Sequence, residues 1–130
     1  MSFWRREVID PALDQETLAQ IAAQRAWIDR DPANPRPYYH LAQLYRVAFR
    51  PDDALGLLLE AIRLDPAFAD AHASLAEIYI VRADYPAAWR HATIAEQHGN
   101  PNPAALLKRY AVPPPTTPDS TPPPGPELDT

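Results

Sequence analysis

Apolar and small residues recur at intervals of three and four through the middle of the chain. The two runs that show this spacing are Tyr38, Leu41, Ala42 and Tyr45, and then Ala54, Leu58, Ala61 and Ile62. Such spacing places each run on one face of an α-helix, and that face must be buried. Between the runs, Pro51 and the two acids after it are typical of a helix start. The pattern therefore predicts two helices, with the chain turning back on itself between them.

The two-helix pattern occurs twice, with a shift of 34 residues. Aligning residues 35–68 with 69–102 pairs identical residues: Leu41 with Leu75, Ala42 with Ala76, Tyr45 with Tyr79, Ala54 with Ala88, and Ala61 with Ala95. The tripeptide Asp31-Pro32-Ala33 recurs as Asp65-Pro66-Ala67. A period of 34 residues with these landmarks resembles the tetratricopeptide repeat family. The resemblance implies an all-α fold, a short right-handed α-solenoid of antiparallel helix pairs.

The turn between the two helices of a repeat departs from the pattern of the family. Relative position 15, which is often glycine in the family, is Phe49 in the first repeat and Ala83 in the second. The second turn otherwise looks much like that of the family. We therefore expect the first turn to follow a different backbone path.

The residues before the first repeat predict one further helix. Asp10-Pro11 has the features of a helix start, with Asp10 as the N-cap and Pro11 in the first turn, and the helix should run to about Arg30. The expected buried stripe is Leu18, Ile21, Ala22, Arg25 and Ile28. Because Asp31-Pro32 matches the end of a repeat, residues 11–34 are interpreted as a half-repeat stacked before repeats 35–68 and 69–102.

Residues 2–9 combine apolar side chains with charge. Phe3 and Trp4 stand at one end and Val8 and Ile9 at the other, but the segment is too short and too charged to form an independent helix. One interpretation is that it covers the apolar end of the helix stack, because the ends of repeat arrays must be covered. The other is that Phe3 and Trp4 anchor a partner protein.

The chain after the second repeat predicts a short cap and a tail. Gly99 can take a left-handed turn at the end of a helix, and prolines follow it. Residues 103–110 are expected to form a short capping helix beside Trp89, which closes a helical domain of residues 1–111. Eight of the 19 residues from 112 to 130 are proline and the rest are mostly polar or acidic, which predicts a disordered tail. The tail is interpreted as a spacer, with binding in polyproline II form as the alternative.

Composition narrows the classes of function. The chain has no cysteine, which excludes disulfides and thiolate chemistry, and its net charge of −5 without a basic cluster argues against nucleic acid as a main partner. No apolar run is long enough to span a membrane, and the charged residues near Phe3 do not fit a signal peptide. These features favour a cytoplasmic protein without direct membrane insertion.

The histidines do not indicate catalysis or a metal. His91 and His98 lie about 10 Å apart along one predicted helix, too far to share a metal ion. Neither His40 nor His72 has an acid or nucleophile at a triad-like or metal-ligand spacing, and the chain lacks a glycine-rich phosphate loop. The sequence therefore predicts no enzyme, no cofactor and no metal site.

The resemblance implies that the first helix of each pair lines a concave face that binds peptides or helices. The corresponding residues, which helical geometry also places off the buried stripe, are Arg36, Tyr39, His40, Gln43, Arg46 and Val47 in the first repeat and Asp70, Ala73, Ser74, Glu77, Ile80 and Val81 in the second. Aromatic residues and arginine are typical of protein interfaces. Lysines and asparagines that grip chaperone tails in some relatives are absent from these positions.

We therefore interpret the chain as a non-catalytic scaffold or adaptor that binds a partner protein of mixed charge. The alternative is an accessory subunit held permanently in a larger enzyme or membrane-associated complex, through the ends of the solenoid and through Phe3 and Trp4. An adaptor should be monomeric when isolated, whereas a subunit should expose apolar patches and self-associate.

Overall fold

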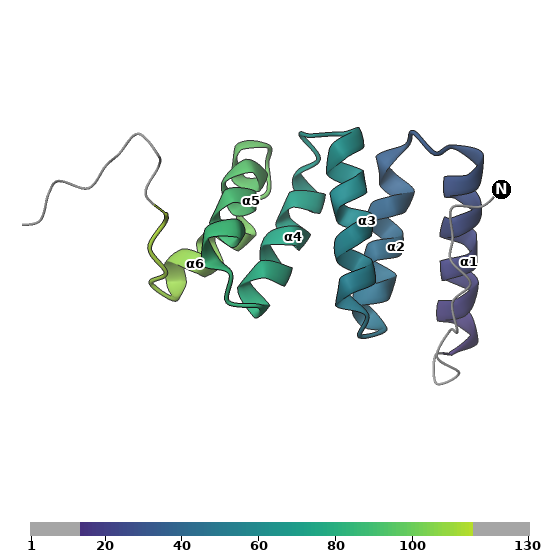
Figure 1. Ribbon diagram of the computed structural model, residues 1–130, viewed down its shortest axis with the longest axis horizontal. Coiled ribbons are helices and arrows are strands. Elements are labelled where there is room, and N and C mark those ends of the chain that lie inside the picture. Colours follow the sequence, from purple (N-terminus) through teal and green to yellow (C-terminus); the bar gives the residue numbers. More distant parts are fainter. Residues whose placement is uncertain (1–13, 116–130) are drawn as a thin grey trace, which may run out of the picture.

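The computed structural model describes residues 14–115 of the chain. Within this range the regular structure is entirely helical, and the helices follow one another in a single row (Figure 1). Their bounds are α1 (Gln15–Arg30), α2 (Pro35–Val47), α3 (Pro51–Leu64), α4 (Ala69–Val81), α5 (Tyr85–Gln97) and α6 (Asn102–Arg109). The most extensive contacts are those of α2 with α3 and of α4 with α5. The predicted all-α stack of helix pairs is confirmed.

The first helix begins later than predicted. Asp14 is its N-cap and accepts a hydrogen bond from the backbone N–H of Thr17 at 2.7 Å, so the helix starts at Gln15 and not at Pro11. Phe3, Trp4 and Asp10 lie outside the described residues, as does the tail after residue 115. Placing the start at Asp10 was an error because two acids in this stretch suit an N-cap equally well on sequence grounds.

The buried stripe of α1 is narrower than predicted. Ile21 and Ile28 are buried, but Ala22 is exposed. Among the described elements α1 has extensive contact only with α2, so a residue on the side away from α2 has no helix to pack against. Including Ala22 in the buried stripe was therefore incorrect.

Two apolar clusters form the core. The larger contains Ile21 and Ile28 of α1 together with the repeated apolar residues of α2, α3 and α4, among them Leu41 and Leu58, which are fully buried. The smaller joins α4, α5 and α6 through Trp89, Leu107 and neighbouring alanines. Alanines at the helix crossings are 0% exposed, as close helix approach requires. The cap formed by α6 beside Trp89 is thus part of the core.

The two turns inside the repeats have the same backbone. Phe49 and Ala83 both have φ of 60°, in the left-handed region. The next residue closes each turn in the same way: Arg50 N–H donates to the Tyr45 carbonyl at 2.8 Å, and Asp84 N–H donates to the Tyr79 carbonyl at 2.9 Å. The expectation that Phe49 changes the path is wrong, because the helices on either side dictate the turn and the side chain projects into solvent.

The links between repeats are also equivalent. The Tyr38 hydroxyl donates to the Pro32 carbonyl at 2.9 Å, and His72 Nε2 lies 2.8 Å from the Pro66 carbonyl, which can only accept. Each first helix therefore holds the proline of the preceding link from the same relative position, although one residue is tyrosine and the other histidine.

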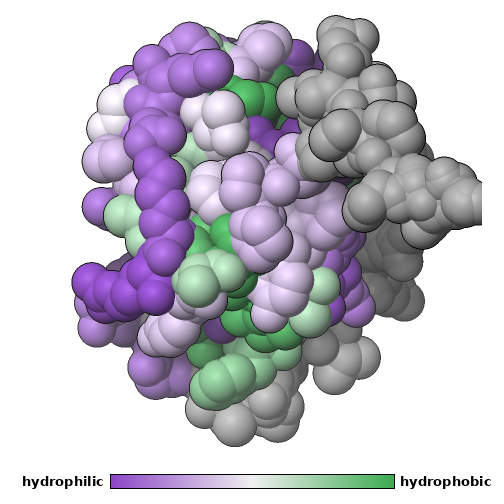
Figure 2. All heavy atoms as spheres, turned by 90° about the vertical axis from the view of Figure 1, so that its left-hand side faces the viewer, coloured by the Kyte–Doolittle hydropathy of each residue, from purple (hydrophilic) through white to green (hydrophobic). Residues whose placement is uncertain are grey.

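The C-terminal end is closed by α6 and the residues after it. Gly99 has φ of 107°, and Asn100 N–H donates to the Ala95 carbonyl at 2.7 Å, which confirms the glycine turn. The Trp89 indole N–H donates to the Val112 carbonyl at 3.2 Å, so Val112 belongs to the packed domain and not to the tail. Figure 2 views this end directly and shows hydrophobic residues (green) reaching the surface between hydrophilic ones (purple).

Candidate partner-binding surfaces

The polar residues in the middle of the α2–α4 face bind each other. Gln43 Nε2 donates to Ser74 Oγ at 2.7 Å, and Arg46 forms an ion pair with Glu77 at 3.0 Å. Arg46 also donates to Gln43 Oε1 at 3.4 Å. This network spans the two first helices, and so the predicted partner-binding residues Gln43, Arg46 and Glu77 fix α2 against α4. They remain half-exposed.

The aromatic residues of this face sit near the start of α2. The Tyr39 ring lies 5.2 Å from Phe68 and 5.4 Å from His40 between centroids. Partial burial and then the Asp70 carboxylate raise the pKa of Tyr39, so its hydroxyl stays protonated at neutral pH. Arg36 and His40 are exposed. These residues leave a polar, aromatic surface open to solvent.

The predicted members in the second repeat are less available. Ala73 is only 5% exposed and cannot present a surface. Ile80 is half-buried and lines a cavity of about 70 Å³ beside Leu106 and Tyr110. The Asn100 amide donates to Asp70 Oδ1 at 3.0 Å. The loop before α6 therefore contacts the predicted face at Asp70, and α6 lies beside Ile80.

An open apolar surface lies at the other end of α2 and α4. Phe49 is 91% exposed and Val81 is 85% exposed, and both line a hollow of about 560 Å³. We call it the Phe49 hollow; its lining is Arg46, Phe49, Pro51, Ile78, Val81 and Arg82. The ion pairs of Arg46 with Glu77 and of Arg82 with Asp52 lie at its rim. The hollow is thus apolar in the middle and bordered by charges of both signs.

Phe49 lowers the stability of the fold at this position. A bulky side chain in the left-handed region is strained by roughly 1–2 kcal/mol, and an exposed phenyl ring gains nothing from burial. Sequence reasoning noticed Phe49 as a departure in the turn but did not include it among the site residues. The available signal was the replacement of a usual glycine by a large apolar residue.

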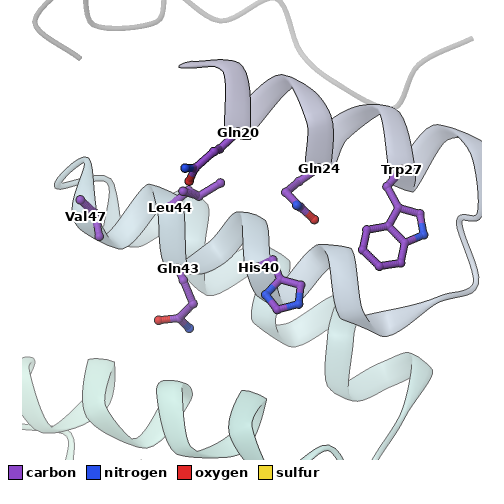
Figure 3. A pocket seen from close by; sticks show the side chains of 7 residues that line it. All are labelled: Gln20, Gln24, Trp27, His40, Gln43, Leu44 and Val47. Atoms are coloured by element: carbon purple, nitrogen blue, oxygen red, sulfur yellow. The ribbon is translucent and has the colours of Figure 1, made fainter. Parts of the chain in front are cut away.

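A second groove lies between α1 and α2 (Figure 3). Gln20, Gln24 and Trp27 project from α1 toward it, and it has a volume of about 450 Å³. The side chains contributed by α2 are those of His40, Gln43, Leu44 and Val47. Gln24 Oε1 is buried and has no hydrogen-bond partner. A buried amide oxygen without a donor is unusual in a folded protein.

The buried histidines form a pair. His72 Nδ1 and His91 Nδ1 are 3.0 Å apart, and the His91 ring also stacks on Tyr79. Burial, followed by the charge of His72, lowers the pKa of His91 to about 4, and burial lowers the pKa of His72. Both rings are therefore neutral at physiological pH. Across residues 14–115 no group of three or more potential metal ligands occurs.

Comparison with known proteins gives no assignment: no protein-family model matches the chain, and none of the curated proteins does. In the described range, no helix is both long enough and apolar enough to cross a membrane.

Proposed function

We propose that the chain is a tetratricopeptide-like interaction module that binds a protein partner and has no catalytic role. The observation that carries this proposal is the Phe49 hollow. A strained, 91% exposed phenylalanine beside an 85% exposed valine brings no stability to the fold, whereas such residues are typical anchors of protein interfaces.

The chemistry of the hollow defines the partner. Its apolar middle suits one aliphatic or aromatic anchor side chain, and Phe49 and Val81 would pack around it. The rim carries two arginines, each already paired with an acid, so a partner segment of mixed charge can exchange ion pairs with it. The exposed Arg36 and the half-buried Tyr39 at the other end of α2 extend this surface along the helix.

Affinity capture of the tagged full chain at native expression level tests the proposal. Phe49→Gly removes the anchor and also relieves the backbone strain at φ of 60°. Ala83→Gly is the control, because it relieves the same strain and leaves the hollow intact. Partners that are captured by the wild type and by Ala83→Gly, but lost with Phe49→Gly, support the proposal. Equal capture by both variants contradicts it.

The same experiment separates an adaptor from an accessory subunit. An adaptor yields several substoichiometric partners that depend on Phe49. An accessory subunit co-elutes in one assembly of fixed stoichiometry that survives high salt and is insensitive to Phe49→Gly.

A further inference from the structure

The α1–α2 groove has a filled counterpart one repeat further along the chain. Adding 34 to its α1 residues gives Ala54, Leu58 and Ala61 of α3, and adding 34 to its α2 residues gives Ser74, Glu77, Ile78 and Val81 of α4. In the second location α2 lies across these positions: Gln43 binds Ser74, and Arg46 binds Glu77. The α1–α2 groove is therefore a slot shaped for a first helix.

The exposure of equivalent residues shows that the α1–α2 groove lacks a covering helix. Ser74 and Ile78 are each 5% exposed beneath α2, whereas their counterparts His40 and Leu44 are exposed and half-buried. On the α1 side, Gln20 is exposed where Ala54 is 0% exposed. None of the helices within residues 14–115 covers these positions. An occupant that packs as α2 does would bury them.

We propose that residues 1–13 of the chain occupy this groove as the first helix of the half-repeat. In the repeat frame these residues hold relative positions 1–13, which are the positions of α2 and of α4, each 13 residues long. Trp4 falls at the position of Tyr38 and His72, and Val8 at that of Ala42 and Ala76. The segment is joined directly to α1, so its effective concentration at the groove is high.

The groove also matches the segment in length and polarity. Proline cannot continue a helix, so a docked helix over residues 2–9 would have about two turns and a length of roughly 12 Å. The span from Gln20 to Trp27 along α1 is about 10 Å. Gln24 Oε1 requires a hydrogen-bond donor, and the Trp4 indole N–H, which can only donate, is one of several in the segment.

Disulfide trapping in the full chain tests the proposal, because the protein has no cysteine of its own. Val8→Cys is combined with Gln24→Cys, whose frame counterparts Ala42 and Leu58 share the buried core. The matched control combines Val8→Cys with Ala26→Cys, an exposed position about 160° around α1 from Gln24. The two pairs enclose loops of nearly equal length, so an undocked segment would cross-link both at similar rates.

We expect the Val8–Gln24 pair to form an intramolecular disulfide at least tenfold faster than the control pair in glutathione disulfide. Equal rates would overturn the proposal and leave Phe3 and Trp4 free to bind a partner. Concentration-dependent dimers would also overturn it, because a second copy would then fill the groove. If the cysteine variant does not fold, hydrogen exchange of the unmodified chain decides: backbone amides of residues 3–9 protected at least tenfold support docking, and unprotected amides contradict it.

Discussion

The imidazoles of His72 and His91 meet Nδ1 to Nδ1 at 3.0 Å, and only one of these two nitrogens can carry a proton. His72 Nε2 donates to the Pro66 carbonyl, so in its neutral form His72 Nδ1 is the acceptor and His91 Nδ1–H the donor. A proton added to His72 would place two N–H groups against each other. The pair therefore couples the packing of α4 on α5 to pH.

This pair predicts a loss of stability in mild acid. The folded-state pKa of each histidine lies below its unfolded value near 6.5, so the unfolded chain binds more protons as pH falls. The contribution of the neutral histidine pair to the free energy of unfolding is fully present above about pH 7 and is lost between about pH 6.5 and 4. We expect the free energy of unfolding, measured in urea, to fall by roughly 2 kcal/mol across that window.

The first repeat shows which residues can replace the two histidines in a variant that tests this pH dependence. His72 and His91 correspond to Tyr38 and Leu57, both of which are buried. His72→Tyr with His91→Leu should remove most of this pH dependence, whereas His40→Gln, at an exposed position, should preserve it. A wild-type protein equally stable at pH 7.5 and pH 5 would refute the account.

Glycine in the left-handed turns should stabilise the fold. Phe49→Gly and Ala83→Gly each relieve a φ of 60°, and we expect each to raise the free energy of unfolding by about 0.5–1 kcal/mol. Ala48→Gly, one residue earlier at φ of −82°, has no strain to relieve and should lower it. Chemical denaturation of the three variants shows whether each substitution raises or lowers the free energy of unfolding. A loss of stability in Phe49→Gly would show that the phenyl ring does support the fold.

The core of the first repeat should be sensitive at Leu58. Leu58 is 0% exposed, so Leu58→Ala leaves a cavity and should cost about 2–5 kcal/mol. Its neighbour Leu59 is 41% exposed, and Leu59→Ala should change stability by less than about 1 kcal/mol. Urea midpoints compare the two. Similar losses would place the helix in a different rotation from the one described.

The packed domain should end just after Val112. A chain shortened after residue 115 should keep the stability of the full chain, because Val112 and its bond from the Trp89 indole remain. A chain shortened after residue 111 loses that carbonyl and the half-buried valine side chain, at a cost of about 1–2 kcal/mol. Thermal unfolding distinguishes them. Equal stability of the two shortened chains would remove Val112 from the core.

The repeat frame made the helix pairs, the core faces and the glycine turn at Gly99 predictable, because periodicity alone specifies which residues face inward. The surface was harder to predict. Ala73 was placed on the open face by its position, yet it is only 5% exposed, because the spacing of residues along one helix does not show which neighbouring elements pack over it. Phe49 was taken as a change of backbone, although the flanking helices impose the same φ on any residue there.

Neighbouring repeats are linked by equivalent hydrogen bonds, one from Tyr38 to the Pro32 carbonyl and one from His72 to the Pro66 carbonyl. If one more copy of residues 35–68 were inserted at such a link, the same hydrogen bond could form on both sides of the new copy. The number of repeats could therefore change by whole units. At the third link the frame places Leu106 and Asn100, and leucine has no hydrogen to donate. A unit inserted in the interior of the array would therefore keep this hydrogen bond, whereas a unit that follows Asn100 in the frame would lack it.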